Sequence, residues 1–187
     1  MATQGYDGAS IADIAAAAGL TSGLVHYHFR NKLEILVAVA ADLREQHERI
    51  LAAALAPCAA NPKRALDTFL DVHLAVGKNA DPERLACWIA VGAEAIRHAE
   101  VRAEYELALE QLADTLEQII AQGVRTRVFH TKHSRSAAVA LLAVIQGYFT
   151  IAGSARALIP NRSAARSAKA MARGLLAAAQ PRGRNES

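Results

Sequence analysis

Two short helical segments follow each other near the N-terminus and are separated by a single glycine turn. Ser10 can cap the first segment, and Thr21 or Ser22 can cap the second, which ends near Phe29. Gly19 stands where a glycine commonly ends a helix. Two short helices joined by a tight turn form a helix-turn-helix, and the apolar residues that would pack the two helices together are Ile11, Ile14, Ala15, Leu20, Val25 and Phe29.

The rest of the chain also predicts helices. Hydrophobic residues make up 52% of it, mostly alanine and leucine, whereas aromatic residues reach only 5%. This composition favours helices over strands, so an all-α fold is expected. Asn31 can cap a long helix, and Asn61-Pro62 and Asp81-Pro82 can each open another. The expected helices run from about 32 to 55, from 62 to Gly77, from 82 through 96, from 101 to 123, from 135 to 157 and from 163 to 179.

These segments divide into two domains and a tail. Residues 1–55 are expected to form the helix-turn-helix domain with the long helix as a linker, and residues 56–180 a helical regulatory and dimerisation domain. Residues 181–187 are polar and are expected to be disordered.

The charge distribution gives only weak support for a nucleic-acid partner. The net charge is +3 and the pI is about 9.1. Residues 1–55, however, carry four basic side chains (Arg30, Lys32, Arg44 and Arg49) against six acidic ones. The two cysteines are too few for a disulfide framework, and the polar start shows no signal peptide, so a cytoplasmic protein is expected.

The segment from Ser136 to Ala155 contains no charged residue and is long enough to span a bilayer. It also contains Gln146 and several glycines and alanines, and no second segment of this kind occurs. A helix that is apolar on every side lies either in a membrane or within a protein. We expect the second arrangement, with no membrane partner.

The outer face of the second short helix has the residues that a DNA-reading helix needs. Polar groups there can reach base edges and phosphates, and Gly23 lets the backbone approach closely. Lys32, at the start of the next helix, is placed to hold a phosphate. The expected outward-facing residues are Ser22, Gly23, Leu24, His26, Tyr27 and His28.

The N-terminal region closely resembles the DNA-binding signature of the TetR family. The matching runs are Gly5-Tyr6, Ile11-Ala-Asp-Ile-Ala15, Ala18-Gly-Leu20, His26-Tyr-His-Phe29 and Asn31-Lys32. The order and lengths of the later helices are similar to the regulatory domain of that family, and Ile145-Gln-Gly-Tyr-Phe149 resembles its betaine-regulator subgroup. The resemblance implies a repressor that binds double-stranded operator DNA through Ser10, Thr21, Ser22, Gly23, Leu24, His26, Tyr27, His28 and Lys32.

The chain departs from the TetR pattern before Gly5. Family members have a full first helix there, which covers the backs of the next two helices, whereas only Met1 to Gln4 precede Gly5 in this sequence. Three explanations of this difference are open. The sequence is trimmed, or the true start codon lies upstream of Met1, or the protein is a natural short form that binds DNA poorly. A ligand-binding or scaffold dimer without DNA-binding activity is therefore the alternative function.

The middle helices combine aromatic bulk with a few polar groups, as small-molecule pockets do. For any one of these residues an ordinary helical core is the simpler interpretation. As a group, and given the family resemblance, they predict a cavity for a small-molecule effector. Its candidate residues are Phe69, His73, Trp88, Glu94, His98, Tyr105, Gln146 and Phe149.

The last two helices have wide apolar faces rich in small residues, which predict a homodimer through a four-helix interface. Its small residues include Gly147, Ala152, Gly153, Ala155, Ala170 and Ala172.

No metal site, cofactor or catalytic centre is expected. His26 and His28 would point to different sides of a helix, and His130 and His133 lie in a basic loop. No catalytic triad or phosphate-binding glycine loop occurs, so an enzyme is not expected.

Overall fold

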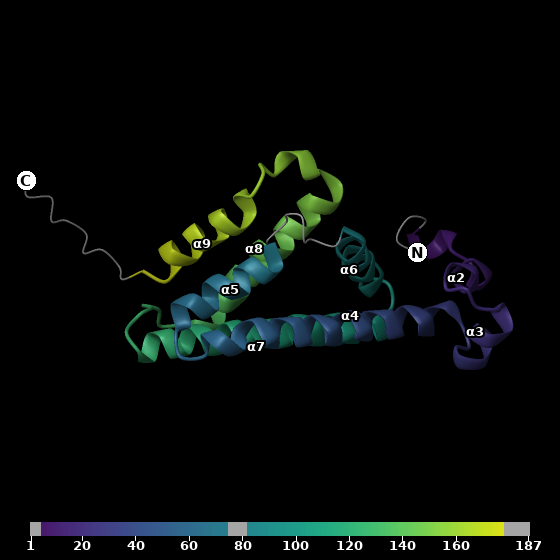
Figure 1. The fold of residues 1–187 in the computed structure, drawn as a ribbon, viewed down its shortest axis with the longest axis horizontal. Helices are drawn as coiled ribbons and strands as arrows, with labels where there is room; N and C mark the ends of the chain where they lie inside the picture. Colours follow the sequence, from purple (N-terminus) through teal and green to yellow (C-terminus); the bar gives the residue numbers. More distant parts are fainter. Residues whose placement is uncertain (1–4, 75–81, 178–187) are drawn as a thin grey trace, which may run out of the picture.

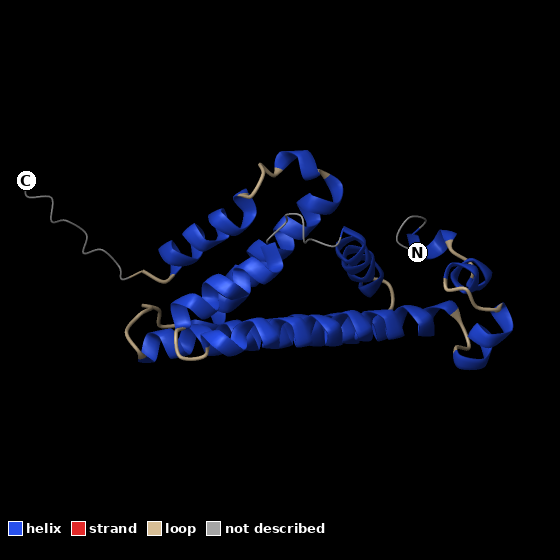
Figure 2. Cartoon of the chain, viewed as in Figure 1, coloured by secondary structure: helices blue, strands red, loops and turns tan. Residues whose placement is uncertain are grey.

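The computed structural model describes residues 5–74 and 82–177, and in these ranges every regular element is a helix (Figures 1 and 2). The all-α prediction is confirmed. The helices are α1 Gly5–Gly8, α2 Ile11–Ala17, α3 Ser22–His28, α4 Lys32–Leu55, α5 Pro62–Leu74, α6 Pro82–Ala95, α7 Ala99–Arg125, α8 Ser134–Ser154 and α9 Ser163–Leu175. The predicted 181–187 tail lies outside the described residues.

The molecule is elongated, with the small N-terminal helices at one end. Helices α4 and α7 run side by side along the long axis, and α2 and α3 lie beyond the start of α4 (Figure 1). Helices α5, α8 and α9 pack over the opposite end, and α6 contacts α4, α7 and α8 between the two regions. We call α1 to α3 with the start of α4 the head, and the remainder the body.

Side-chain caps fix the starts of α2, α3 and α4, as the sequence predicts. Ser10 and Asp13 form a reciprocal capping box, in which each side chain accepts a hydrogen bond from the backbone N–H of the other. Thr21 and Asn31 accept hydrogen bonds from backbone N–H groups in the first turns of α3 and α4. Gly19 adopts a φ of +68°, a left-handed conformation that favours glycine and allows the tight turn.

The head has a small core of its own, in which Ala15, Val25 and Ile35 are buried against one another. Four further apolar residues pack on it (Ile11, Ile14, Phe29 and Val39). The prediction that Leu20 joins this core is wrong, because its side chain is 47% exposed. Leu20 follows Gly19 in the turn, so it lies off the surfaces on which α2 and α3 face each other.

The main core lies in the body, where α5, α7, α8 and α9 meet. Its largest fully buried side chains include Phe69, Leu70, Leu74, Leu116, Ile120, Leu141 and Ile145. Helix α8 buries one face here, while residues such as Val139 and Ile151 remain exposed on the chain. Among the described residues, α8 is the one helix with the length and composition to cross a membrane, which is weak support for a membrane location.

Replacing Gly123 with alanine is expected to lower the free energy of unfolding by about 1–3 kcal/mol. A Cβ at this position would overlap the buried ring of Phe129, lying only 2.7 Å from Phe129 Cγ. The ring has little room to move aside, because Phe129 is only 8% exposed. Urea denaturation followed by circular dichroism measures the effect. Gly23→Ala is the control, since a Cβ at Gly23 meets nothing within 4 Å, and equal losses in both variants would contradict the prediction.

Candidate functional site

Helix α3 is exposed at six of its seven positions. Val25 is buried, at 6% exposure, and anchors the helix to the head core. Tyr27 is 82% exposed and Leu24 is 44% exposed. The remaining residues of the predicted DNA-reading surface, Ser22, Gly23, His26 and His28, are exposed as well. The structure therefore exposes these six residues at the tip of the molecule, while their contacts with DNA stay a prediction.

The other three predicted DNA-contacting residues have contacts within the head. The hydroxyls of Ser10 and Thr21 cap α2 and α3, and both residues are exposed. The Lys32 ammonium points inward: it donates hydrogen bonds to the carbonyls of Tyr6 (2.5 Å) and Ala9 (3.0 Å), and lies 4.4 Å from the centre of the Tyr6 ring. Whether the ammonium also contacts a DNA phosphate stays a prediction. In this structure Lys32 joins α1 to the start of α4.

The junction between head and body is formed mainly by the second half of α6. Val91 and Ala95 of α6 are buried with Leu36 and Ala40 of α4, and Tyr6 packs on this cluster. The Tyr6 ring also meets the His98 ring edge to face, with centroids 5.6 Å apart. The helix that borders the body interior therefore also supports the start of α4.

Glu94 and His98, which the sequence assigned to ligand binding, lie at this junction and do not line the body cavity. Glu94 is buried, at 6% exposure, and its Oε1 accepts a 2.6 Å hydrogen bond from Arg97. His98 Nε2 lies 3.5 Å from Glu94 Oε2. Glu94 lies nearly two turns beyond Trp88 on α6, and His98 lies past the end of α6, just before α7; neither residue lines the cavity.

A cavity of about 720 Å³ lies between α4, α5, α6, α7 and α8. Four of the predicted ligand-binding residues line it: His73, Trp88, Gln146 and Phe149. Its remaining lining residues are Leu43, Arg44, His47, Glu48, Ile50, Leu51, Asp71, Val72, Arg84, Leu85, Ala108, Gln111, Leu112, Asp114 and Thr115. This size is within the range of small-molecule sites.

Two other predicted ligand-binding residues stand behind the cavity wall. Tyr105 stacks on Trp88, with ring centroids 4.7 Å apart. Phe69 is fully buried in the main core and stacks on His73 at 4.4 Å. These rings position lining residues rather than line the cavity themselves, because each is covered by the aromatic neighbour on which it stacks.

The cavity contains a histidine pair that the sequence analysis missed. His47 Nε2 lies 2.9 Å from His73 Nε2, and His73 Nδ1 lies 2.7 Å from the Phe69 carbonyl. A carbonyl only accepts, so His73 Nδ1 donates to it; Nε2 of neutral His73 then accepts from His47 Nε2–H. A signal for His47 was present in the sequence, since it shares a helical face with Leu43, Ile50 and Leu51.

Both histidines of this pair are held neutral. Burial lowers the pKa of His73 to about 3, with a further contribution from His47, against the opposing effect of the Phe69 hydrogen bond. Burial also lowers the pKa of His47, helped by the positive charge of Arg84. The polar groups in this part of the cavity are therefore uncharged imidazoles at neutral pH.

Lowering the pH from 7 to 5 is expected to destabilise the protein through this pair. The pKa values of both histidines are lowered in the folded state, so the unfolded chain binds protons that the folded chain does not. Each histidine should contribute at most about 1.4 kcal/mol per pH unit below its unfolded pKa of about 6.5. Urea denaturation at each pH measures this slope. His73→Gln should flatten it and exposed His130→Gln should not; equal slopes in the two variants would contradict the assignment.

Within residues 5–74 and 82–177, no group of three or more histidine, cysteine or acidic side chains is placed to hold a metal ion.

Comparisons with known proteins agree with this two-part arrangement. The model of bacterial regulatory proteins of the tetR family matches residues 1–39, and the BetI-type transcriptional repressor C-terminal model matches residues 62–181. The HTH-type transcriptional regulator BetI of Rhizobium meliloti (strain 1021) is 31% identical over 99 residues, or 53% of this chain. That match spans about half of the relative, 48% of its length.

Solved structures of bacterial regulators share the fold. A transcriptional regulator from Pseudomonas aeruginosa PAO1 superposes with a TM-score of 0.81 at 20% identity, over 93% of this chain and 83% of its own. A regulator from Saccharomonospora viridis in complex with choline gives 0.76 at 22% identity, over 92% and 87%. At these identities the likeness concerns the fold, whereas the two family models cover both the head and most of the body. The chain therefore belongs to the TetR family of bacterial regulatory proteins, with a BetI-type C-terminal region.

Proposed function

We propose that the protein is a ligand-responsive transcriptional repressor that binds operator DNA through α3 and releases it when a small molecule occupies the cavity. The main support for this proposal is that the single helix α4 runs from the head to the cavity. Its first turns support the DNA-reading surface, and its later residues Leu43, His47 and Leu51 line the cavity. On this proposal the protein acts in the cytoplasm by binding rather than by catalysis.

Helix α6 offers a second connection between the cavity and the head. Trp88 lines the cavity, while Val91 and Ala95 pack against α4. The helix is closely fitted to its neighbours, because a Cβ at Gly92 would lie 3.1 Å from the Tyr105 hydroxyl. A ligand that displaces Trp88 would therefore move α6 and α4 together. Recognition helices must match half-sites one helical turn apart, so a small change in their separation lowers operator affinity.

The same function requires two copies of the chain, and α8 and α9 have exposed faces suited to a homodimer. Small and apolar residues lie on these faces and would allow close helix approach. They are Ala140, Ala143, Gly147 and Ile151 on α8, and Ala170, Met171, Gly174 and Leu175 on α9. Two of the small residues expected at the interface belong to the chain's own packing: Ala172 is 1% exposed, and a Cβ at Gly153 would overlap Ile89.

DNA binding to the promoter regions beside the gene tests the proposed function. Gel-shift assays at low and moderate salt, on the 187-residue chain and on a form extended upstream of Met1, should show a specific complex. Sedimentation should show a dimer. The choline-bound relative shows that this fold can accept a small organic molecule, so candidate effectors are then tested for release of the complex. No specific complex with flanking DNA or from a random-sequence selection would instead favour the ligand-binding dimer.

A further inference from the structure

The head carries few positive charges, although its proposed partner is a polyanion. Within residues 5–40, which comprise the head, the sequence has two basic residues, Arg30 and Lys32, against three acidic ones. The phosphate backbone of DNA supplies a large share of the affinity of most DNA-binding proteins, and lysine and arginine side chains are its usual partners. The contacts of these two cations therefore bear directly on how the head meets DNA.

The structure gives the two cations of the head different surroundings. The Lys32 ammonium is partly buried and donates hydrogen bonds to the carbonyls of Tyr6 and Ala9. The Arg30 side chain is 92% exposed, and its Nε lies 4.0 Å from Glu34 Oε1. An exposed ion pair at this distance contributes little, so another anion can replace the carboxylate at small cost. Arg30 is therefore the more accessible cation of the head.

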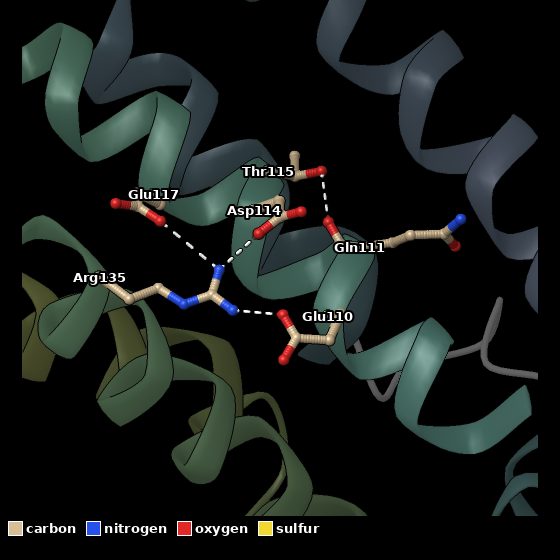
Figure 3. Close-up of polar contacts among 6 residues, drawn as sticks. All are labelled: Glu110, Gln111, Asp114, Thr115, Glu117 and Arg135. Atoms are coloured by element: carbon tan, nitrogen blue, oxygen red, sulfur yellow. Dashed lines mark hydrogen bonds and ion pairs between the residues drawn. The ribbon is translucent and has the colours of Figure 1, made fainter. Parts of the chain in front are cut away.

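An arginine of the body shows the opposite situation. Arg135 meets three carboxylates of α7, those of Glu110, Asp114 and Glu117 (Figure 3). The charge around this guanidinium is negative in sum, so a phosphate that approached it would be repelled. Arg30 forms an ion pair with one carboxylate, which leaves no such surplus of negative charge beside it.

Arg30 also lies next to the helix that is proposed to read DNA. It is two residues past His28, the last residue of α3, so its Cα is within about 7 Å of that helix end. Figure 1 shows α3 and the start of α4 together at the tip of the molecule. The N-terminal residues of a recognition helix contact base edges in the major groove. The segment after its C-terminal end then lies nearer the rim of the groove, where the phosphates are.

The backbone that carries Arg30 is fixed by the structure on its C-terminal side. Its N–H donates a 2.8 Å hydrogen bond to Glu34 Oε2, and the next residue, Asn31, caps α4. A side chain on an ordered backbone loses less freedom on binding than one on a disordered segment. We propose that Arg30 binds a phosphate of the DNA backbone, once in each half-site. The proposal rests on the proposed function, because it assumes that α3 enters the major groove.

The salt dependence of DNA binding tests this proposal, because each phosphate contact releases counterions. The probes are a labelled duplex of mixed sequence and the promoter fragment beside the gene, followed by fluorescence anisotropy. A dimer has two copies of Arg30, so Arg30→Gln should reduce the slope of log K against log salt by about 1.8. Between about 50 and 200 mM salt, the unmodified chain should therefore lose about tenfold more affinity than the variant. The change should be the same on both duplexes, because phosphate contacts carry no sequence information.

Two further variants serve as matched controls. Arg49→Gln removes an exposed arginine that also pairs with a glutamate four residues away at 4.0 Å. Arg49 lies roughly 26 Å along α4 from Lys32, more than twice the Debye length of about 10 Å, so its slope should change by less than about 0.3. Arg30→Lys keeps the charge and should retain the slope, since lysine also binds phosphate. Circular dichroism and urea denaturation check that each variant is folded.

The outcomes separate this proposal from the function on which it rests. If the promoter fragment is bound specifically and Arg30→Gln has the same slope as Arg49→Gln, the repressor function stands and the phosphate contact is wrong. A loss confined to the promoter fragment would also overturn the contact, because Arg30 would then read a base. If the slope falls as expected on the mixed-sequence duplex but no specific site is found, the contact stands and the repressor function fails. If the unmodified chain binds neither duplex, both are wrong.

Discussion

Replacing His26 and Tyr27 together with alanine is expected to lower operator affinity by about a hundredfold. Both side chains lie on the exposed surface of α3, and Tyr27 is 82% exposed. Each contact that reads a base contributes roughly 1–3 kcal/mol, so the loss of two contacts reaches this size. The fold should be unaffected, because neither side chain belongs to the head core. Fluorescence anisotropy with labelled operator, at one fixed salt concentration, measures the affinity.

The matched control removes side chains of similar exposure from the body. His130 is exposed and Leu158 is 74% exposed, and both are outside the head. The double variant H130A/L158A should bind operator within about twofold of the unmodified chain, since replacing an exposed surface side chain usually has a small effect on stability. Unchanged affinity in the His26 and Tyr27 variant, with a normal circular dichroism spectrum, would show that α3 does not read the operator.

Replacing Phe69 with alanine is expected to lower the free energy of unfolding by about 3–5 kcal/mol. Phe69 has no exposed surface and lies at the centre of the main core. Its ring also stacks on His73, and its carbonyl accepts the hydrogen bond that sets the His73 tautomer. The truncation therefore leaves a void behind the cavity wall and lets the His73 ring shift. Urea denaturation and the fluorescence of Trp88, which lines the cavity, report the two effects.

Ile96→Ala is the control for Phe69, because Ile96 is 77% exposed. Its stability should change by no more than about 0.5 kcal/mol. A loss below about 1 kcal/mol for Phe69→Ala would mean that the surrounding helices close over the void, and that the core is less rigidly packed than its burial indicates.

The sequence predicted the head well because its signals are local. A cap acts on a backbone N–H three residues away, as at Ser10 and Asn31, and Gly19 acts on its own φ angle. Such signals place helix ends within about a residue. The burial of Leu20 was predicted wrongly, because the direction of a side chain in a turn depends on how the two flanking helices cross.

The cavity was harder to predict because it depends on contacts between distant helices. Helical periodicity shows which face of a helix is apolar, but it does not show what lies opposite that face. Trp88 and Glu94 are on the same helix, yet one lines the cavity and the other lies at the junction with the head. The inward direction of Lys32 likewise depends on the carbonyls of Tyr6 and Ala9, which approach it only in the folded chain.

The continuous course of α4 also limits how this protein could be re-engineered. The helix has 24 residues and extends about 36 Å without interruption from the head into the cavity wall. One inserted or deleted residue within it would rotate everything downstream by about 100°, and would turn His47 away from His73. A chimera that gives this body a foreign head should therefore be joined before Asn31, in the loop, so that the rotational phase of α4 is preserved. Joints within α4 should succeed only when they keep its length unchanged.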